Sequence, residues 1–168
     1  MRKPALPDAR KRRPPESADI LLVLAELARH RVDYALLGGA AMAFHGFPRM
    51  TKDIDLIVPR SARNNARLLK ALAALRERLA LHQLPDKKTL DAGFSTAAEG
   101  ELGIDILFVA ASKTFEDYRE YIIARELDGV PVRMLDIDGM LMSKQTDRPE
   151  DIPDRQRLLR LKTPGGRR

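Results

Sequence analysis

Two aspartates, Asp53 and Asp55, interrupt the apolar run IDLIV, which otherwise has the composition of a buried strand. Side chains alternate between the two faces of a strand, so both aspartates point to one face, while Ile54, Leu56 and Val58 point to the other. Two carboxylates on one face repel each other and are costly to bury without a partner. The run therefore predicts a strand with one face in the core and an acidic opposite face that needs an explanation.

A divalent cation would remove the repulsion between these two aspartates. Oxygen-only, carboxylate-rich ligation suits Mg²⁺ or Mn²⁺, and Mg²⁺ usually takes one or two protein carboxylates together with substrate phosphates and water. The chain has no cysteine, which excludes disulfides, thiolate zinc sites and thiol nucleophiles. The alternative is that the aspartates lie on a solvent-facing strand or cap a turn after Thr51.

A pair of glycines precedes the aspartates. In the segment ALLGGAAMAFHG, a short strand, Tyr34 to Leu37, runs through Gly38 and Gly39 into a short helix. Such a turn leaves backbone N–H groups exposed at the helix N-terminus, and glycine lets a phosphate approach the backbone closely. Alone, the glycines fit a tight turn equally well. With the two carboxylates on the next strand, they form a coherent site for phosphates and the metal that bridges them.

Further carboxylates lie on later segments. Asp105 stands between two isoleucines in the strand-like run GIDILFV, where an acid is out of place unless it faces a site or a sheet edge. Three carboxylates could hold two metal ions about 3.5–4 Å apart, one activating an attacking hydroxyl and one stabilising a leaving pyrophosphate. A second pair, Asp136 and Asp138, falls where a strand passes into a helix. We interpret that pair as structural, with Asp138 as the N-cap.

A basic and acidic segment follows the second aspartate pair. Lys144 precedes Arg148, Asp151 and Asp154, which recur at a spacing compatible with a helix. Lys144 could reach a triphosphate as a point charge, and Arg148 could pair with Asp151. Surface salt bridges account for the same spacing equally well.

The order of apolar patterns predicts an α+β domain, with a small mixed β-sheet and helices packed mainly on one face. Helix and strand signals alternate early in the chain, and a hairpin follows at an Asp-Gly turn. The expected helices are 17–29 with Ser17 or Asp19 as cap, 40–45, 61–81 with Ser61 as cap, 138–145 and 149–161, with a helical turn at 113–118. The expected strands are 34–37, 54–58, 93–98, 103–111, 121–127 and 130–137, and 84–93 is expected to be a polar loop.

The length of 168 residues predicts one domain, residues 17–162, between basic tails at 1–16 and 163–168. The net charge of +6 comes from the two ends, because residues between 19 and 162 hold 21 basic and 21 acidic side chains. We expect the first tail to be disordered, although its KRRPP run could contact RNA or another polyanion. No apolar run approaches the ~20 residues of a membrane span, so we expect a cytoplasmic protein with no anchor or signal peptide.

These residues resemble a known family. GGAAMAFHGFPRMTKDIDLIV is similar to the signature of the nucleotidyltransferase fold of polymerase-β-like enzymes, a GG or GS turn followed by a DxD strand. The narrower form HG-x-PR-x-T-x-DIDL resembles small bacterial nucleotidyltransferases grouped with the AbiEii toxins of type IV toxin–antitoxin systems. The run K-x(3)-R-x(2)-D-x(2)-D, residues 144–154, is similar to their C-terminal helical segment, so the resemblance spans roughly residues 35–161.

The resemblance implies a role for each motif residue. The glycine turn would bind the nucleotide phosphates, the first two aspartates would bind metal, and the third would ligate metal and help to deprotonate an acceptor hydroxyl. Arg49, Thr51 and Lys144 would be nearby phosphate or substrate contacts. Gly39 stands where many family members have serine, so backbone amides must replace a hydroxyl contact. The implied ligands are Mg²⁺ or Mn²⁺ and a nucleoside triphosphate (NTP).

Two hypotheses follow. The first is a metal-dependent nucleotidyltransferase that moves a nucleoside monophosphate from an NTP to an acceptor hydroxyl and releases pyrophosphate. The acceptor would be RNA, a protein side chain or a small molecule, and a cognate antitoxin would be a partner if the chain is a toxin. The alternative keeps the fold without the activity, as a nucleotide-binding or RNA-binding regulatory module. Three aligned acids favour the enzyme, because a pure binding module has no need of them.

Overall fold

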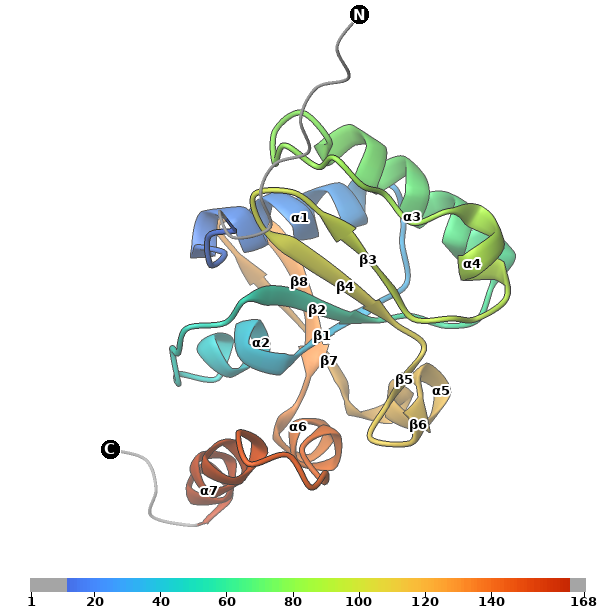
Figure 1. Ribbon diagram of the computed structural model, residues 1–168. Helices are drawn as coiled ribbons and strands as arrows, with labels where there is room; N and C mark the ends of the chain where they lie inside the picture. The colour runs from blue at the N-terminus through green and yellow to red at the C-terminus, as the bar shows by residue number, and fades with distance from the viewer. Residues whose placement is uncertain (1–11, 164–168) are drawn as a thin grey trace, which may run out of the picture.

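A six-stranded mixed sheet organises residues 12–163, the part of the chain that the computed structural model describes (Figure 1). The strand order is β3-β4-β2-β1-β8-β7, and β5 and β6 form a separate two-stranded ribbon. The elements, in chain order, are α1 (Ser17–Arg29), β1 (Ala35–Leu37), α2 (Gly38–Phe44), β2 (Asp53–Ile57), α3 (Ala62–Leu75), α4 (Lys87–Asp91), β3 (Thr96–Glu99), β4 (Gly103–Leu107), β5 (Val109–Ala110), β6 (Lys113–Thr114), α5 (Phe115–Tyr118), the 3₁₀ helix η2 (Arg119–Tyr121), β7 (Ile122–Leu127), β8 (Val130–Leu135), α6 (Ile137–Ser143) and α7 (Asp151–Lys162).

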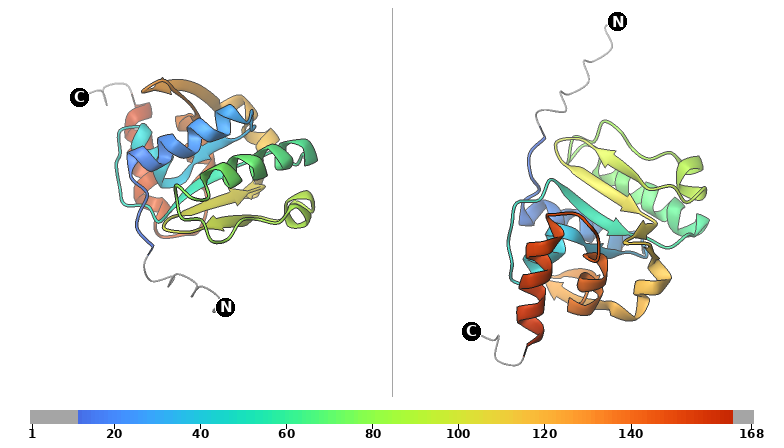
Figure 2. Two further views of the ribbon diagram at one scale, coloured as in Figure 1. Left: turned by 90° about the horizontal axis from the view of Figure 1, so that it is seen from above. Right: turned by 60° about the horizontal axis from the view of Figure 1, so that its bottom comes forward.

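Helices lie on both sides of this sheet. The two longest, α1 and α3, run side by side over one face, whereas α2, α6 and α7 lie on the other side (Figure 2). The predicted α+β class with a mixed sheet is confirmed. Helices were expected mainly on one face of the sheet, and the two longest do lie on the same face. The helices on the other side leave part of the sheet uncovered, and the cavity described below opens there.

The alternation expected for β2 is present. Ile54 and Leu56 are fully buried, whereas Asp53 and Asp55, which alternate with them, are only partly buried. The neighbouring strand β4 follows the same pattern, with Ile104 and Ile106 fully buried around Asp105. Each strand therefore anchors itself through its apolar face and presents acids on the opposite face.

The register of three neighbouring strands brings distant parts of the sequence together. Strand β1 is antiparallel to β2 and pairs Leu37 with Asp55, so the glycine turn begins directly beside that aspartate. Strand β2 is parallel to β4 and pairs Asp55 with Asp105, and Asp53 with Gly103. The sheet itself thus sets the third carboxylate next to the first two.

Two predicted helix caps are displaced. Ser17 and Asp19 do not cap α1, because Glu16 is the N-cap and its backbone N–H donates to the Asp19 carboxylate at 2.7 Å. Asp138 does not cap α6 either, since Asp136 holds that position. In both cases several nearby acids can serve as the cap, and the sequence alone does not fix where the first turn begins.

The long amphipathic segment differs in length from the prediction. Ser61 caps α3 as expected, but the helix ends at Leu75 instead of continuing to Leu81. The segment predicted to be a polar loop contains the short helix α4, which Asp86 caps. Only Leu90 of α4 is buried, which is too little apolar signal to reveal a helix from sequence.

The ends of the described chain differ from simple tails. Residues 12–16, part of the segment expected to be disordered, lie against the domain, where the Arg13 N–H donates to the Glu101 carbonyl at 2.8 Å. Residues 1–11 of that tail, and 164–168 of the C-terminal tail, lie outside the described residues. Within residues 12–163, no helix is long and apolar enough to cross a membrane.

The cap of α3 gives a first prediction. The Ser61 hydroxyl accepts a hydrogen bond from the Asn64 N–H at 3.2 Å, so Ser61→Ala should lower the free energy of unfolding by about 1 kcal/mol in urea denaturation. Ser17→Ala is the matched control, because Ser17 is exposed at the start of α1 and is not its cap. Equal losses in both variants would contradict the assigned cap.

Candidate active site

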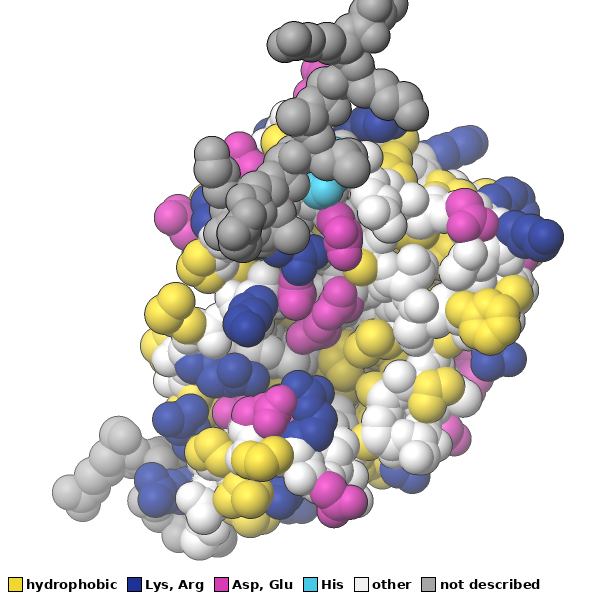
Figure 3. Space-filling model, viewed as in Figure 1, with side chains coloured by type: hydrophobic (Ala, Val, Ile, Leu, Met, Phe, Trp, Pro, Cys, Tyr) yellow, Lys and Arg dark blue, Asp and Glu magenta, His cyan; other side chains and the backbone are white. Residues whose placement is uncertain are grey.

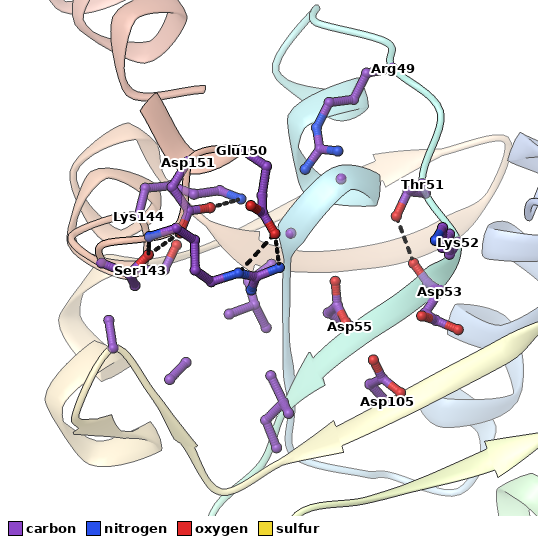
Figure 4. Close-up of a pocket in the computed structure, with 18 of the residues that line it drawn as sticks. Arg49, Thr51, Lys52, Asp53, Asp55, Asp105, Ser143, Lys144, Glu150 and Asp151 are labelled. Carbon is purple, nitrogen blue, oxygen red and sulfur yellow. Dashed lines mark hydrogen bonds and ion pairs between the residues drawn. The ribbon is translucent and has the colours of Figure 1, made fainter. Parts of the chain in front are cut away.

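One cavity of about 690 Å³ gathers every residue that the sequence predicted to bind metal, phosphate or substrate. It opens between the acidic ends of β2 and β4, the start of α2, and the segment joining α6 to α7 (Figure 4). The predicted residues that line it are Gly38, Gly39, Arg49, Thr51, Asp53, Asp55, Asp105 and Lys144. Asp136 and Asp138 are not among the lining residues, as expected for a structural pair.

The carboxylates of Asp53, Asp55 and Asp105 lie close together, which disfavours the ionised forms of Asp55 and Asp105. Burial, and then the charge of Asp105, raises the pKa of the Asp55 carboxyl to about 7. Burial, and then the charge of Asp53, raises the pKa of Asp105 as well. Both shifts have the causes expected for acids that share a site without a neutralising cation, because the charged form is poorly solvated and repelled by its neighbours. The site is therefore short of positive charge.

The three carboxylates are suitable ligands for a hard divalent cation, although their side chains are not arranged around one metal position. All three groups are carboxylates from two adjacent strands, and they line one cavity. Among residues 12–163, no three acidic or histidine side chains are already arranged around a single metal position. The Asp53 carboxylate instead pairs with Arg12, with Oδ1 and Nη1 3.3 Å apart. A metal at Asp53 would therefore meet the charge of Arg12 on Oδ1 of the same carboxylate.

The glycine turn is a steric requirement of the site. Gly38 has φ +68°, a conformation that side-chain-bearing residues rarely adopt, and a Cβ added there would lie 2.1 Å from Oδ2 of Asp55. A Cβ on Gly39 would lie 2.6 Å from the Cβ of Thr51. The Thr51 hydroxyl also donates to the Asp53 carbonyl at 3.0 Å, which fixes the start of β2. The two glycines thus let the first turn of α2 pack directly against the acidic strand.

Lys144 and Arg49 reach the cavity from a buried ion-pair network. The Lys144 ammonium lies 3.2 Å from Asp151 and 3.0 Å from Asp154, and the Arg49 guanidinium lies 3.0 Å from the same Asp154. Asp154 is 1% exposed, so it needs these partners. Nε of Arg49 is buried without a hydrogen-bond partner among the described residues, so this guanidinium retains an unused donor.

Several cavity residues were not predicted. Arg148 lines the cavity and pairs with Glu150 at 2.6 Å, whereas the spacing had allowed a pair with Asp151 or a surface salt bridge. Further polar lining residues are Lys52, Ser143 and Thr146, and one wall is apolar, formed by Leu37, Leu107, Val109, Ala110 and Ala111. Figure 3 shows acidic side chains near the centre of this face, with basic side chains beside and below them. The position of Lys52 next to Asp53 was a sequence signal that it lines the cavity. Nothing in the sequence indicated which apolar residues line it.

A structural match shows that the class of the protein is a nucleotidyltransferase-like fold. A crystal structure of an antigenic nucleotidyltransferase-like protein from Paracoccidioides brasiliensis is similar to the chain, with a TM-score of 0.56 and 19% identity over 92% of this chain and 82% of that one. No curated protein matches the chain. The family model of the nucleotidyl transferase AbiEii toxin of type IV toxin–antitoxin systems matches residues 20–146. The chain belongs to the AbiEii family, whose activity is nucleotidyl transfer, as the resemblance implied.

The glycine turn gives the second prediction. Gly38→Ala adds both backbone strain and a clash with Asp55, whereas Gly46→Ala adds strain alone, because Gly46 has φ +92° with open space around it. Gly46→Ala should cost about 1–2 kcal/mol, the penalty for a left-handed residue, and Gly38→Ala should cost more. Urea denaturation of both variants measures the difference. Equal destabilisation would show that the close approach of α2 to Asp55 is relaxed at little cost.

The raised pKa of Asp55 gives the third prediction. Below about pH 4 this carboxyl is protonated in both folded and unfolded chains, and between about pH 4 and 7 it ionises only in the unfolded chain. The penalty on the folded state therefore grows as pH rises through this window. In metal-free protein, Asp55→Asn should gain stability relative to wild type between pH 4.5 and 7.5 in urea denaturation, whereas Asp138→Asn should not. A constant difference across that range would refute the shift.

Proposed function

We propose that this chain uses a divalent metal, Mg²⁺ or Mn²⁺, to transfer a nucleoside monophosphate from an NTP to an acceptor hydroxyl. The observation that supports this most directly is the convergence of three crowded carboxylates, a glycine turn and four basic side chains on one cavity. Family membership already implies nucleotidyl transfer and an NTP substrate. The metal, the acceptor and the role of each residue are what the proposal adds.

Asp53, Asp55 and Asp105 are the proposed metal ligands. Their oxygen-only chemistry suits Mg²⁺ or Mn²⁺, and the raised pKa values of Asp55 and Asp105 indicate a site that favours a bound cation. When bound, the metal neutralises charge on the phosphates and lowers the pKa of a coordinated hydroxyl. The remaining functions fall to side chains and backbone groups of the chain.

The basic and glycine residues are proposed to bind the triphosphate. Gly38 and Gly39 let the phosphates approach the backbone at the start of α2, because neither carries a Cβ. Arg49 contributes a partly exposed guanidinium, and Lys144 contributes a charge fixed by two buried acids. Thr51 positions the start of β2 through its hydrogen bond to Asp53. These contacts would hold the α-phosphate beside the carboxylates.

The transfer itself is a single displacement at the α-phosphorus. The acceptor oxygen forms a bond to that phosphorus, the bond from the phosphorus to the oxygen bridging to the β-phosphate breaks, and pyrophosphate leaves. The proton of the acceptor hydroxyl passes to the carboxylate of Asp105. Asp105 is suited to this role by its position, because it lines the cavity opposite Asp55.

The acceptor and partners follow from the same proposal. The acceptor is a hydroxyl of RNA or of a protein, and the identity of the labelled product distinguishes the two. The type IV toxin–antitoxin family implies an antitoxin as a partner. A cytoplasmic location, where both NTP and such acceptors are abundant, completes the proposed setting.

The fourth prediction tests the transfer. Purified chain is incubated with an α-³²P-labelled NTP, Mg²⁺ and bacterial RNA or protein, and both labelled acceptor and released pyrophosphate are measured. Wild type should label an acceptor, and Asp53→Asn with Asp55→Asn should reduce labelling by about 10²-fold or more, because metal-assisted charge stabilisation is worth several kcal/mol. Chelation of the metal should have the same effect.

Asp136→Asn with Asp138→Asn is the matched control, since it removes the same charges from an Asp-x-Asp pair outside the cavity. That variant should label the acceptor as wild type does. Labelling that survives loss of Asp53 and Asp55 would reject the proposed site. NTP binding without any transfer by wild type would instead favour the non-catalytic module.

A further inference from the structure

The described N-terminal segment, residues 12–16, places an arginine on one of the proposed metal ligands. Nη1 of Arg12 lies 3.3 Å from Oδ1 of Asp53, and its Nη2 lies 3.5 Å from Oε1 of Glu99 on β3. The side chains of Arg12 and Asp53 meet over Gly103 of β4. A Cβ added at Gly103 would lie 2.0 Å from Oδ1 of Asp53 and 2.8 Å from Nη2 of Arg12. The absence of a side chain at Gly103 leaves the room in which this ion pair forms.

The neighbouring residue anchors this segment. The Arg13 N–H donates to the Glu101 carbonyl at 2.8 Å, and its guanidinium binds both carboxylate oxygens of Asp19 at 2.6 and 2.9 Å. This bidentate pair lowers the pKa of Asp19, as expected when an arginine stabilises the ionised acid. Arg13 therefore ties the segment to α1 and to the turn between β3 and β4. Arg12 is held beside Asp53 whether or not its own side chain is bound there.

A guanidinium and a divalent cation compete for the same carboxylate oxygens. Because the segment is tethered, the contact of Arg12 with Asp53 is intramolecular and needs no external ligand to form. We propose that Arg12 is an autoinhibitory residue, which occupies Oδ1 of Asp53 in the metal-free protein and opposes ligation of a metal by that carboxylate. This inference rests on the proposed function, since it takes Asp53 to be a metal ligand.

The contact has the strength expected of a reversible inhibitor. The side chains of Arg12 and Asp53 are 32% and 24% exposed, so water and salt screen their attraction. Partly exposed ion pairs of this kind are weak, and losing one should change a competing equilibrium by about two- to fivefold. Arg12 thus raises the metal concentration needed to fill the site without preventing binding.

The test measures metal binding directly, apart from catalysis. Free Mn²⁺ is titrated into the full-length chain at low ionic strength and followed by electron paramagnetic resonance, which separates free from bound ion. Arg12→Ala should bind Mn²⁺ about two- to fivefold more tightly than wild type, and this gain should shrink in high salt. Arg13→Ala, which loosens the anchor, should give a gain in the same direction.

Arg63→Ala is the matched control for net charge, because Arg63 is exposed on α3 and does not line the cavity. It should bind Mn²⁺ as wild type does. Asp53→Asn tests the site itself and should weaken binding. If wild type and Arg12→Ala bind equally while Asp53→Asn binds poorly, autoinhibition is wrong and the metal site stands. Weaker binding by Arg12→Ala also overturns the inference, and absence of Mn²⁺ binding in every variant overturns the metal site and the inhibition together.

Discussion

Repulsion among three carboxylates is the constraint around which the site is built. Parallel pairing of β2 with β4 sets Asp55 directly opposite Asp105, with Asp53 two residues away on the same face. Burial and mutual charge raise the pKa of the paired acids, so the sheet holds them together against their preference. Two cations oppose this effect, since Lys144 lowers the pKa of Asp55 and Arg12 lowers that of Asp105. Neither outweighs burial, so the pKa of both acids stays raised.

The C-terminal helix α7 belongs to the site through this electrostatic requirement. Lys144 opposes the charge of Asp55, but a buried ammonium is itself costly to desolvate. Asp151 and Asp154, both nearly inaccessible at the start of α7, offset that cost, and Asp154 also holds Arg49. The charge of the aspartates on β2 is thus partly offset by Lys144, about ninety residues later in the chain. The charge of Lys144 is in turn offset by the two buried acids of α7. The ion pairs of Lys144 with Asp151 and Asp154 give a physical reason for the lysine and the two aspartates of the K-x(3)-R-x(2)-D-x(2)-D run.

Sequence revealed the parts of this arrangement that have a local period. Alternation in IDLIV and GIDIL placed the acids opposite the apolar side chains, and the glycine pair marked the entry to α2. The burial of Asp151 and Asp154 was not predictable, because their spacing fits a solvated helix face equally well. Helix α4 was missed because it buries a single leucine. Pairing of Arg148 with Glu150 was missed because spacing on an expected helix does not describe the loop that precedes it.

The contact of Arg12 with Asp53 was not predictable from the sequence. Arg12 also differs in exposure from the other cation near the acids, Lys144. Forty-one residues divide the partners, and a basic run before a helix has the composition of a solvated tail. Its side chain is 32% exposed, whereas that of Lys144 is 8% exposed and bound by two buried acids. Salt therefore screens the charge of Arg12 more strongly than that of Lys144. The acidic face therefore has a buried cation near Asp55 and a partly exposed one beside Asp53, and the proposed metal would compete only with the partly exposed one.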